Sequence, residues 1–318
     1  MKRIYLIPLL LLLLAGCRRQ STVASTNRNS GTVEKMSLAE ARRGFQTKLV
    51  RREAAGEPLP KPPPILFRPV TFDAPSGRLA AFLSPDPHDG RKHPAIIWIT
   101  GGDCSTLDDG FWKKGSANGD QTASGFREAG IPMMFPTLRG GNQNPGFREG
   151  FFGEVDDVLA ATDYLVKQPF IDPQRIYLGG MSNGGTLVLL VAASSDRFRA
   201  VFAFGPADDV AGYSSEYLPF DTSNPREFEL RSPIRWLQAI RVPVFVFEGT
   251  VQGNLASLRE LKQASTNPKI RFHAVQNANH VSVLAPTVRL IAGKILSDDG
   301  PQSNIVFTDE EVNRPFAR

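Results

Sequence analysis

Two side chains of the sequence have the types and positions needed for nucleophilic catalysis. Ser182 lies in GGMSNGG between a predicted strand and a predicted helix, a context that exposes a serine oxygen on a strained turn. A serine hydroxyl needs a base that takes its proton. His280, in QNANHVSVLAP beyond the last predicted strand, has the place in the chain that suits this base. The pair predicts acyl transfer through Ser182.

The residues around Ser182 predict how a developing negative charge would be stabilised. Glycines on both sides of the serine let the strand and the helix pack closely, and the helix N-terminus supplies free N–H groups. We expect one oxyanion donor from the backbone of Asn183. A second donor should come from Gly102 or Asp103, in TGGDCS after another predicted strand. Cys104 in that segment has no strand–turn–helix context, so we interpret it as a small loop residue.

Composition narrows the class of protein. Of the 318 residues, 41% are hydrophobic and 22% are charged, as in ordinary globular proteins. The formal charge of +5 is spread along the chain without a long Lys/Arg run, so we expect no nucleic-acid partner. Four histidines and two cysteines offer little for a metal site, and we predict neither a metal nor a cofactor. The expected partner is a small-molecule or peptide substrate.

Beyond Leu66 the sequence alternates apolar strands with helical patterns. We predict strands at 67–74, 79–84, 94–100, 131–137, 175–180, 198–205, 242–249 and 270–276, the first two as a hairpin. Helical patterns cover 121–129, 154–168, 184–195, 233–240, 255–265 and 286–296. The alternation predicts an α/β protein with a mostly parallel central sheet and helices on both faces. Such sheets bind ligands at the C-terminal ends of their strands, where Ser182 and His280 fall.

Five segments in this order resemble one family. They are RGGNQNPGF, EVDDVLAATDYL, IDPQRIYLGGMSNGG, SPIRWLQAIRVPVFVFEGT and NANHVSVLAP. Together they resemble the catalytic domain of the prolyl oligopeptidase family of serine hydrolases over roughly residues 66–297. The resemblance implies an α/β-hydrolase fold and a Ser-Asp-His triad, with Ser182 and His280 in two of its positions. Peptidases of that family place a large β-propeller before this domain, and we expect none here because only 65 residues precede it.

The acid of the triad is the member that the sequence leaves open. The family pattern after the strand is a stretch such as HGTxD, whereas this chain has EGTVQ, so that Gln252 occupies the aspartate position. Glu248, at the end of that strand, is the favoured acid. Asp208 and Asp209, in FGPADDV after the preceding strand, are the alternatives. In a third explanation the acid is absent and the protein binds a ligand without turning it over.

We therefore predict a serine hydrolase, an esterase or peptidase that works through an acyl-enzyme intermediate. The alternative is a non-catalytic ligand-binding lipoprotein with a degraded triad. Arg139, in TLRGGNQNPGF, either binds a substrate carboxylate or orders its own loop, and we favour the second role. Asp156 and Asp157 fall near the start of a predicted helix, where negative charge is favourable, and are interpreted as structural.

The ends of the chain predict export. Residues 1–16, MKRIYLIPLLLLLLAG, combine early cations with an apolar run too short to span a bilayer, and Leu-Ala-Gly-Cys ends the pattern of a bacterial lipoprotein signal. Cys17 would carry lipid and anchor the exported protein to the membrane of the cell envelope. We expect residues 17–65 to form a flexible tether, a short helix capped by Ser37 and Glu40, and a proline-rich linker. Residues 66–297 would form the hydrolase domain and 298–318 a C-terminal tail.

Overall fold

The computed structural model describes residues 36–113, 115–116 and 119–317. The signal segment and Cys17 lie outside the described residues. Among the residues that are described, none of the helices is both long and apolar enough to cross a bilayer.

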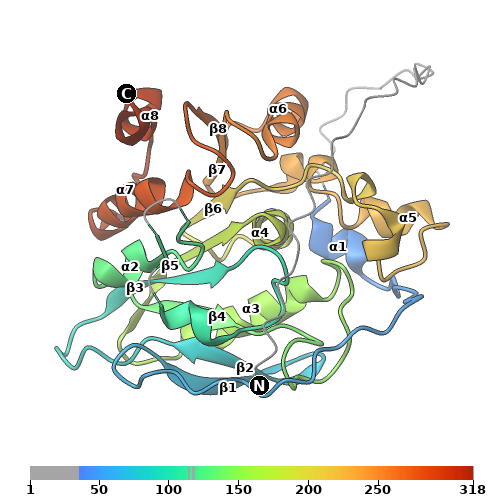
Figure 1. Ribbon diagram of the computed structural model, residues 1–318, viewed down its shortest axis with the longest axis horizontal. Helices are drawn as coiled ribbons and strands as arrows, with labels where there is room; N and C mark the ends of the chain where they lie inside the picture. The colour runs from blue at the N-terminus through green and yellow to red at the C-terminus, as the bar shows by residue number, and fades with distance from the viewer. Residues whose placement is uncertain (1–35, 114, 117–118, 318) are drawn as a thin grey trace, which may run out of the picture. The chain divides into compact units, whose positions relative to one another are not determined.

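One eight-stranded sheet organises the protein (Figure 1). Its strands are β1 (Arg68–Ala74), β2 (Gly77–Leu83), β3 (His93–Ile99), β4 (Met133–Pro136), β5 (Ile171–Met181), β6 (Ala200–Phe204), β7 (Val244–Gly249) and β8 (Ile270–Val275). Their order in space is β1-β2-β4-β3-β5-β6-β7-β8. The β1–β2 hairpin and the β2–β4 pair are antiparallel, and β4, β3 and the strands from β5 to β8 run parallel. The predicted α/β-hydrolase fold is confirmed.

Helices follow most of the parallel strands. They are α1 (Leu38–Arg42), α2 (Ser124–Glu128), α3 (Glu154–Leu165), α4 (Asn183–Ser194), α5 (Pro225–Glu229), α6 (Leu255–Ala264), α7 (Leu284–Leu296) and α8 (Asp309–Asn313). The 3₁₀ helices are η1 (Asp109–Trp112), η2 (Val210–Gly212), η3 (Ser215–Tyr217), η4 (Pro233–Arg235), η5 (Leu237–Ala239) and η6 (Arg314–Phe316). The prediction of one helix over 233–240 is therefore wrong, since this segment forms the two short 3₁₀ helices η4 and η5.

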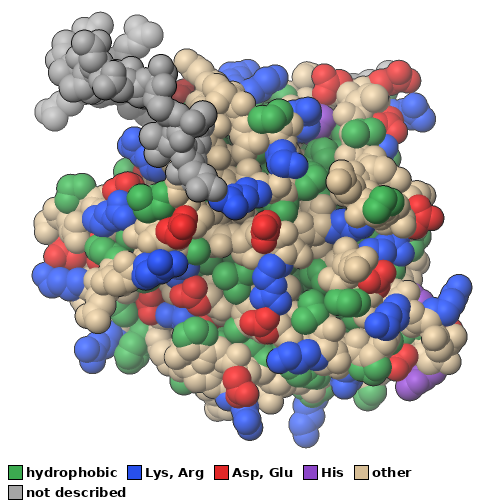
Figure 2. Space-filling view, turned by 180° about the vertical axis from the view of Figure 1, so that it is seen from behind, with side chains coloured by type: hydrophobic (Ala, Val, Ile, Leu, Met, Phe, Trp, Pro, Cys, Tyr) green, Lys and Arg blue, Asp and Glu red, His purple; other side chains and the backbone are tan. Residues whose placement is uncertain are grey.

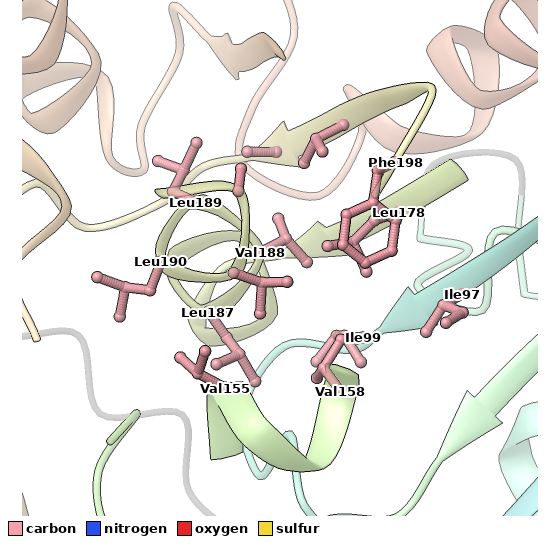
Figure 3. Close-up of a cluster of buried hydrophobic side chains, with 14 of the residues drawn as sticks. Ile97, Ile99, Val155, Val158, Leu178, Leu187, Val188, Leu189, Leu190 and Phe198 are labelled. Atoms are coloured by element: carbon pink, nitrogen blue, oxygen red, sulfur yellow. The ribbon is translucent and has the colours of Figure 1, made fainter. Parts of the chain in front are cut away.

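Alternate residues of the strands build the core on the two faces of the sheet. In β3, Ile97 and Ile99 join a cluster with α3 and α4, whereas Ile96 and Trp98 join a second cluster with α2 and α7. Figure 3 shows the first cluster, in which side chains of α3, α4 and β3 meet. Because both faces of β3 are covered, its sequence is continuously apolar. Because both faces are buried, the pairing register between neighbouring strands is well defined, and so are the positions of the strand ends.

The segment before the hydrolase domain is packed onto it. Leu38 of α1 is fully buried against the α3–α4 face of the core, and the guanidinium of Arg42 forms a bidentate ion pair with Asp156 at 2.7 and 3.0 Å. The Ser37–Glu40 capping box is present as predicted. The helix is short, and Gly44 takes a left-handed conformation (φ 78°) just beyond it.

The segment after the hydrolase domain is packed as well. Asp298 is fully buried and accepts hydrogen bonds from Arg199 and from the hydroxyl of Tyr177. Ile305 and Val312 belong to the core cluster that contains α7. The sequence-based limits of 66 and 297 therefore do not separate structural units, because described residues on both sides of them share one core.

Charged side chains are mixed on the surface. On the face in Figure 2, Lys and Arg side chains lie among Asp and Glu side chains, without a large patch of one sign. The spread of charge along the sequence is thus also a spread in space on this face.

Candidate active site

Ser182 occupies a sharp turn between β5 and α4. Its backbone has φ 54° and ψ −118°, a strained conformation for a residue with a side chain. The N–H of Ser182 donates to the carbonyl of Phe204 in β6 at 2.7 Å, which holds the turn against the neighbouring strand. The sharp strand–turn–helix geometry predicted for this serine is present.

Three glycines make the turn possible. A Cβ on Gly184 would overlap the carbonyl oxygen of Ile99 at the end of β3, and one on Gly180 would lie 2.6 Å from the carbonyl oxygen of Gly184. A Cβ on Gly185 would lie 2.6 Å from the carbonyl oxygen of Phe204. The start of α4 therefore contacts the backbones of the strands directly, and this contact positions Ser182.

His280 is hydrogen-bonded to Glu248. The ring Nδ1 of His280 lies 2.7 Å from Oε2 of Glu248, which is fully buried at the end of β7. The backbone N–H groups of Gly249 and Asn254 also donate to this carboxylate, at 2.7 and 3.1 Å. Because the carboxylate accepts a hydrogen bond from Nδ1, the neutral imidazole carries its proton on Nδ1. Its Nε2 is then free to act as a base. Glu248 is thus positioned to orient the histidine.

Two glycines enclose this pair. A Cβ on Gly205, at the end of β6, would lie 2.5 Å from Oε2 of Glu248 and 2.6 Å from Nδ1 of His280. A Cβ on Gly253 would lie 2.7 Å from the Cβ of His280. Both glycines have positive φ, of 53° and 99°. The carboxylate and the imidazole are therefore held between two segments of backbone, with little freedom to separate.

The other acid candidates have different surroundings. Asp209 caps η2, since its Oδ1 accepts from the N–H of Ala211 at 2.8 Å and from the hydroxyl of Ser232 at 2.7 Å. The side chain of Gln252 is exposed on a residue with φ 67°. Within the described part of the chain, the hydrogen bonds found for His280, Asp208 and Asp209 join neither aspartate to the imidazole. Of the three carboxylates considered from the sequence, Glu248 is the one that meets His280.

The two predicted oxyanion segments are joined by a side chain. Nδ2 of Asn183 donates to the carbonyl of Gly102 at 2.8 Å, and Oδ1 of Asn183 accepts from the hydroxyl of Tyr213 at 2.7 Å. The N–H of Asn183 lies in the first turn of α4, where backbone donors have no partner within the helix. Tyr213 was not found from the sequence, because it follows η2 in a polar excursion without a recognisable motif. Its pKa is raised to about 12 by burial, which keeps the hydroxyl a donor.

Arg139 orders its own loop. Its guanidinium donates twice to Asp157 in α3, at 2.9 Å each, and once to Glu149 at 2.6 Å. The backbone N–H of Arg139 also donates to Asp157, at 2.9 Å. These partners occupy the side chain, so the structure favours the structural role over the binding of a substrate carboxylate.

Cys104 and two further histidines, His273 and His93, have surroundings that do not favour a role as nucleophile or base. Burial raises the pKa of Cys104 to about 12, so that its thiol stays protonated. His273 stacks on Phe247 and lies 3.3 Å from Asp309, and burial lowers its pKa. His93 lies 3.0 Å from Asp89 at the start of β3, the opposite end of the strands from Ser182.

Comparison with known proteins finds a family and several relatives that match part of this chain. Residues 148–292 match the model of the prolyl oligopeptidase family. A dual function macrocyclase-peptidase POPB of Galerina marginata is 30% identical over 35% of this chain and 17% of its own length. Dipeptidyl-peptidase 5 of Porphyromonas gingivalis is 30% identical over 38% of this chain and 18% of its own length. The chain thus matches less than a fifth of the length of each of these two relatives.

A solved structure shows the same fold. A puromycin-hydrolyzing peptidase of Mycobacterium tuberculosis superposes with a TM-score of 0.61 at 20% identity, covering 76% of this chain and 40% of that protein. The segment that matches the family model contains Ser182, Glu248 and His280. The protein has an α/β-hydrolase fold whose residues 148–292 match the prolyl oligopeptidase family.

Proposed function

We propose that this protein is a serine hydrolase that cleaves a peptide or ester bond through an acyl-enzyme intermediate. The observation that carries the proposal is the 2.7 Å hydrogen bond between His280 and the fully buried Glu248. The strained turn at Ser182 and the family match support it. In this assignment Ser182 is the nucleophile, His280 the base and Glu248 the residue that positions the base.

The reaction would follow two steps. Nε2 of His280 takes the hydroxyl proton while Oγ of Ser182 attacks the substrate carbonyl carbon. The resulting oxyanion accepts from backbone N–H groups of Asn183 and of Gly102 or Asp103. The tetrahedral intermediate collapses, the C–N or C–O bond breaks, and the leaving group receives the proton from His280. Water, deprotonated by the same imidazole, then attacks the acyl carbon. The C–O bond to Ser182 breaks, the acid product is released, and His280 returns the proton to Oγ of Ser182.

Covalent labelling tests this proposal. A fluorophosphonate probe should label the wild-type protein, and Ser182→Ala should remove both the labelling and the hydrolysis of p-nitrophenyl acetate. Circular dichroism of both proteins checks that the fold persists. A wild-type protein that neither labels nor hydrolyses would favour the non-catalytic ligand-binding alternative. Matched peptide anilides and esters then tell peptidase from esterase.

We also propose that the protein is exported and anchored to the cell envelope by lipid on Cys17. The support is the sequence pattern of residues 1–17. Cys17→Ser should move the protein from the membrane fraction to the soluble fraction, and mass spectrometry of the N-terminal peptide should show the loss of lipid. An unlipidated wild-type N-terminus would contradict the anchor.

A further inference from the structure

A cavity of about 320 Å³ lies beside the predicted oxyanion segments. Gly102 and Asn183 line it, so the cavity adjoins the turn that holds Ser182. Phe151, Tyr213 and Leu218 give it an apolar and aromatic wall. Its volume is enough for one amino-acid side chain of a substrate.

Glu154 gives this cavity a buried carboxyl group. It lines the cavity, and the residue is 2% exposed at the first position of α3. Its Oε1 accepts from the backbone N–H of Glu149 at 2.6 Å, whereas its Oε2 is buried without a hydrogen-bond partner among the described residues. A buried polar atom without a partner is costly. Glu154 therefore brings to the cavity wall a carboxyl oxygen that has no hydrogen-bond partner among the described residues.

The buried ionic network around Glu154 has more carboxylates than guanidinium groups. Its members are Arg139, Glu149, Glu154, Asp157, Glu227 and Arg231. Arg139 bonds Asp157 and Glu149, and Arg231 bonds Glu227. Glu154 is left without a guanidinium of its own, and burial raises its pKa to about 7. A cation entering the cavity would balance this charge.

The other charged groups of the cavity wall already have partners. Arg148 donates to Asp103 at 2.6 Å, and Glu53 accepts from Arg51 at 2.8 Å. Nε of Arg148 is buried without a partner among the described residues. The unused carboxyl oxygen of Glu154 is thus the feature that selects for a positive group.

We propose that this cavity binds the acyl-side residue of the substrate and that Oε2 of Glu154 pairs with the cationic end of a lysine or arginine side chain. The inference rests on the proposed hydrolase function and names its substrate class. The aliphatic stem of such a side chain would lie against the apolar wall, and its charged end would reach Glu154. Charge-assisted hydrogen bonds of this kind are among the stronger polar contacts in proteins.

Fluorogenic amides with arginine or citrulline as the acyl residue test the proposal, because citrulline has nearly the same shape without the charge. The wild-type protein should prefer arginine in kcat/KM by at least about 30-fold, as expected for a buried charge pair. Glu154→Gln should bring this ratio close to one. Glu260→Gln, the same change at an exposed position of α6, should keep the wild-type ratio. A ratio near one in the wild type would overturn the proposal.

A binding measurement separates this proposal from the proposed reaction. Arginine amide should raise the melting temperature of the wild type more than citrulline amide does, and Glu154→Gln should abolish the difference. If fluorophosphonate labelling fails while the arginine-specific shift persists, the hydrolase function is contradicted and the cation site is supported. If labelling succeeds and neither the shift nor the kinetic ratio favours arginine, the cation site alone is contradicted.

Discussion

Glu248 is held by the sheet itself. Glu248 is the next-to-last residue of β7. Its carboxylate accepts hydrogen bonds from two backbone N–H groups in addition to its hydrogen bond with His280. Its anchoring is therefore stiffer than that of a carboxylate on an exposed loop. Gln252, where the family pattern has its aspartate, lies exposed in such a loop. An aspartate introduced there by Gln252→Asp should therefore not take over the role of Glu248 in orienting His280.

Replacing Glu248 by its amide should abolish most turnover. We expect Glu248→Gln to lower kcat for p-nitrophenyl acetate by about 10³–10⁴-fold with little change in KM, because the loss falls on orienting and stabilising the imidazolium. Steady-state kinetics measures both constants. Asp209→Asn is the matched control, since Asp209 caps η2. A larger loss in the Asp209 variant would reassign the acid.

The ionisation of Glu154 should be visible in the stability of the protein. Burial raises its pKa from 4.5 to about 7. Between these values the unfolded chain releases a proton that the folded protein keeps, so stability falls as pH rises and the loss is complete above about pH 7. Glu154→Gln cannot ionise and escapes this loss. Its melting temperature relative to the wild type should therefore rise between about pH 5 and pH 8, and a constant difference would contradict the buried ionisation.

The close contact between α4 and β3 leaves no room for a side chain at Gly184. A Cβ there would overlap the carbonyl oxygen of Ile99 and lie 2.6 Å from that of Thr100, so Gly184→Ala should cost at least about 1–3 kcal/mol of unfolding free energy and displace Ser182. Gly293→Ala on α7 is the control, because its Cβ would have no described heavy atom within 4 Å. It should gain about 0.5–1 kcal/mol from helix propensity. Urea unfolding measures both, and equal effects would contradict the packing argument.

Elements with a strong local signal were predictable from the sequence, and those shaped by distant contacts were not. The runs PAIIWIT and VPVFVFEG became β3 and β7 because both faces of these strands are buried. Residues 233–240 carry a helical pattern, but the segment forms two 3₁₀ turns that meet at Trp236, a residue of the core. Ser182 and His280 could be placed because their elements come in a known order. The contact of Glu248 with His280 could not be predicted from the sequence, because a glutamate or an aspartate at a neighbouring strand end could each serve as the acid.

The cavity beside Asn183 could not be predicted, because it is built from distant parts of the chain. Glu154 comes from the start of α3, and Tyr213 follows η2 after β6. In the sequence Glu154 stands beside acidic residues that favour a helix start, so its pattern suggests a structural role alone. Only burial and the missing hydrogen-bond partner of its Oε2 distinguish it.

The N-terminal described segment should contribute to the stability of the whole protein. Leu38 is fully buried in the core, so Leu38→Ala should cost about 2–5 kcal/mol and lower the melting temperature by several degrees. Met36→Ala, at a side chain that is 57% exposed, is the control and should have little effect. Calorimetry of the full chain measures both. An unchanged melting temperature for Leu38→Ala would mean that this segment is a tether after all.

The position of Glu248 in a strand has a consequence for how this site can change during evolution. Glu248 pairs with Ala274 of β8 in a fixed register. An insertion of a single residue within β7 ahead of Glu248 would turn the carboxylate to the opposite face of the sheet, because side chains alternate along a strand. A lineage that keeps this acid must therefore conserve the length of β7, whereas a loop-borne acid tolerates insertions and deletions around it.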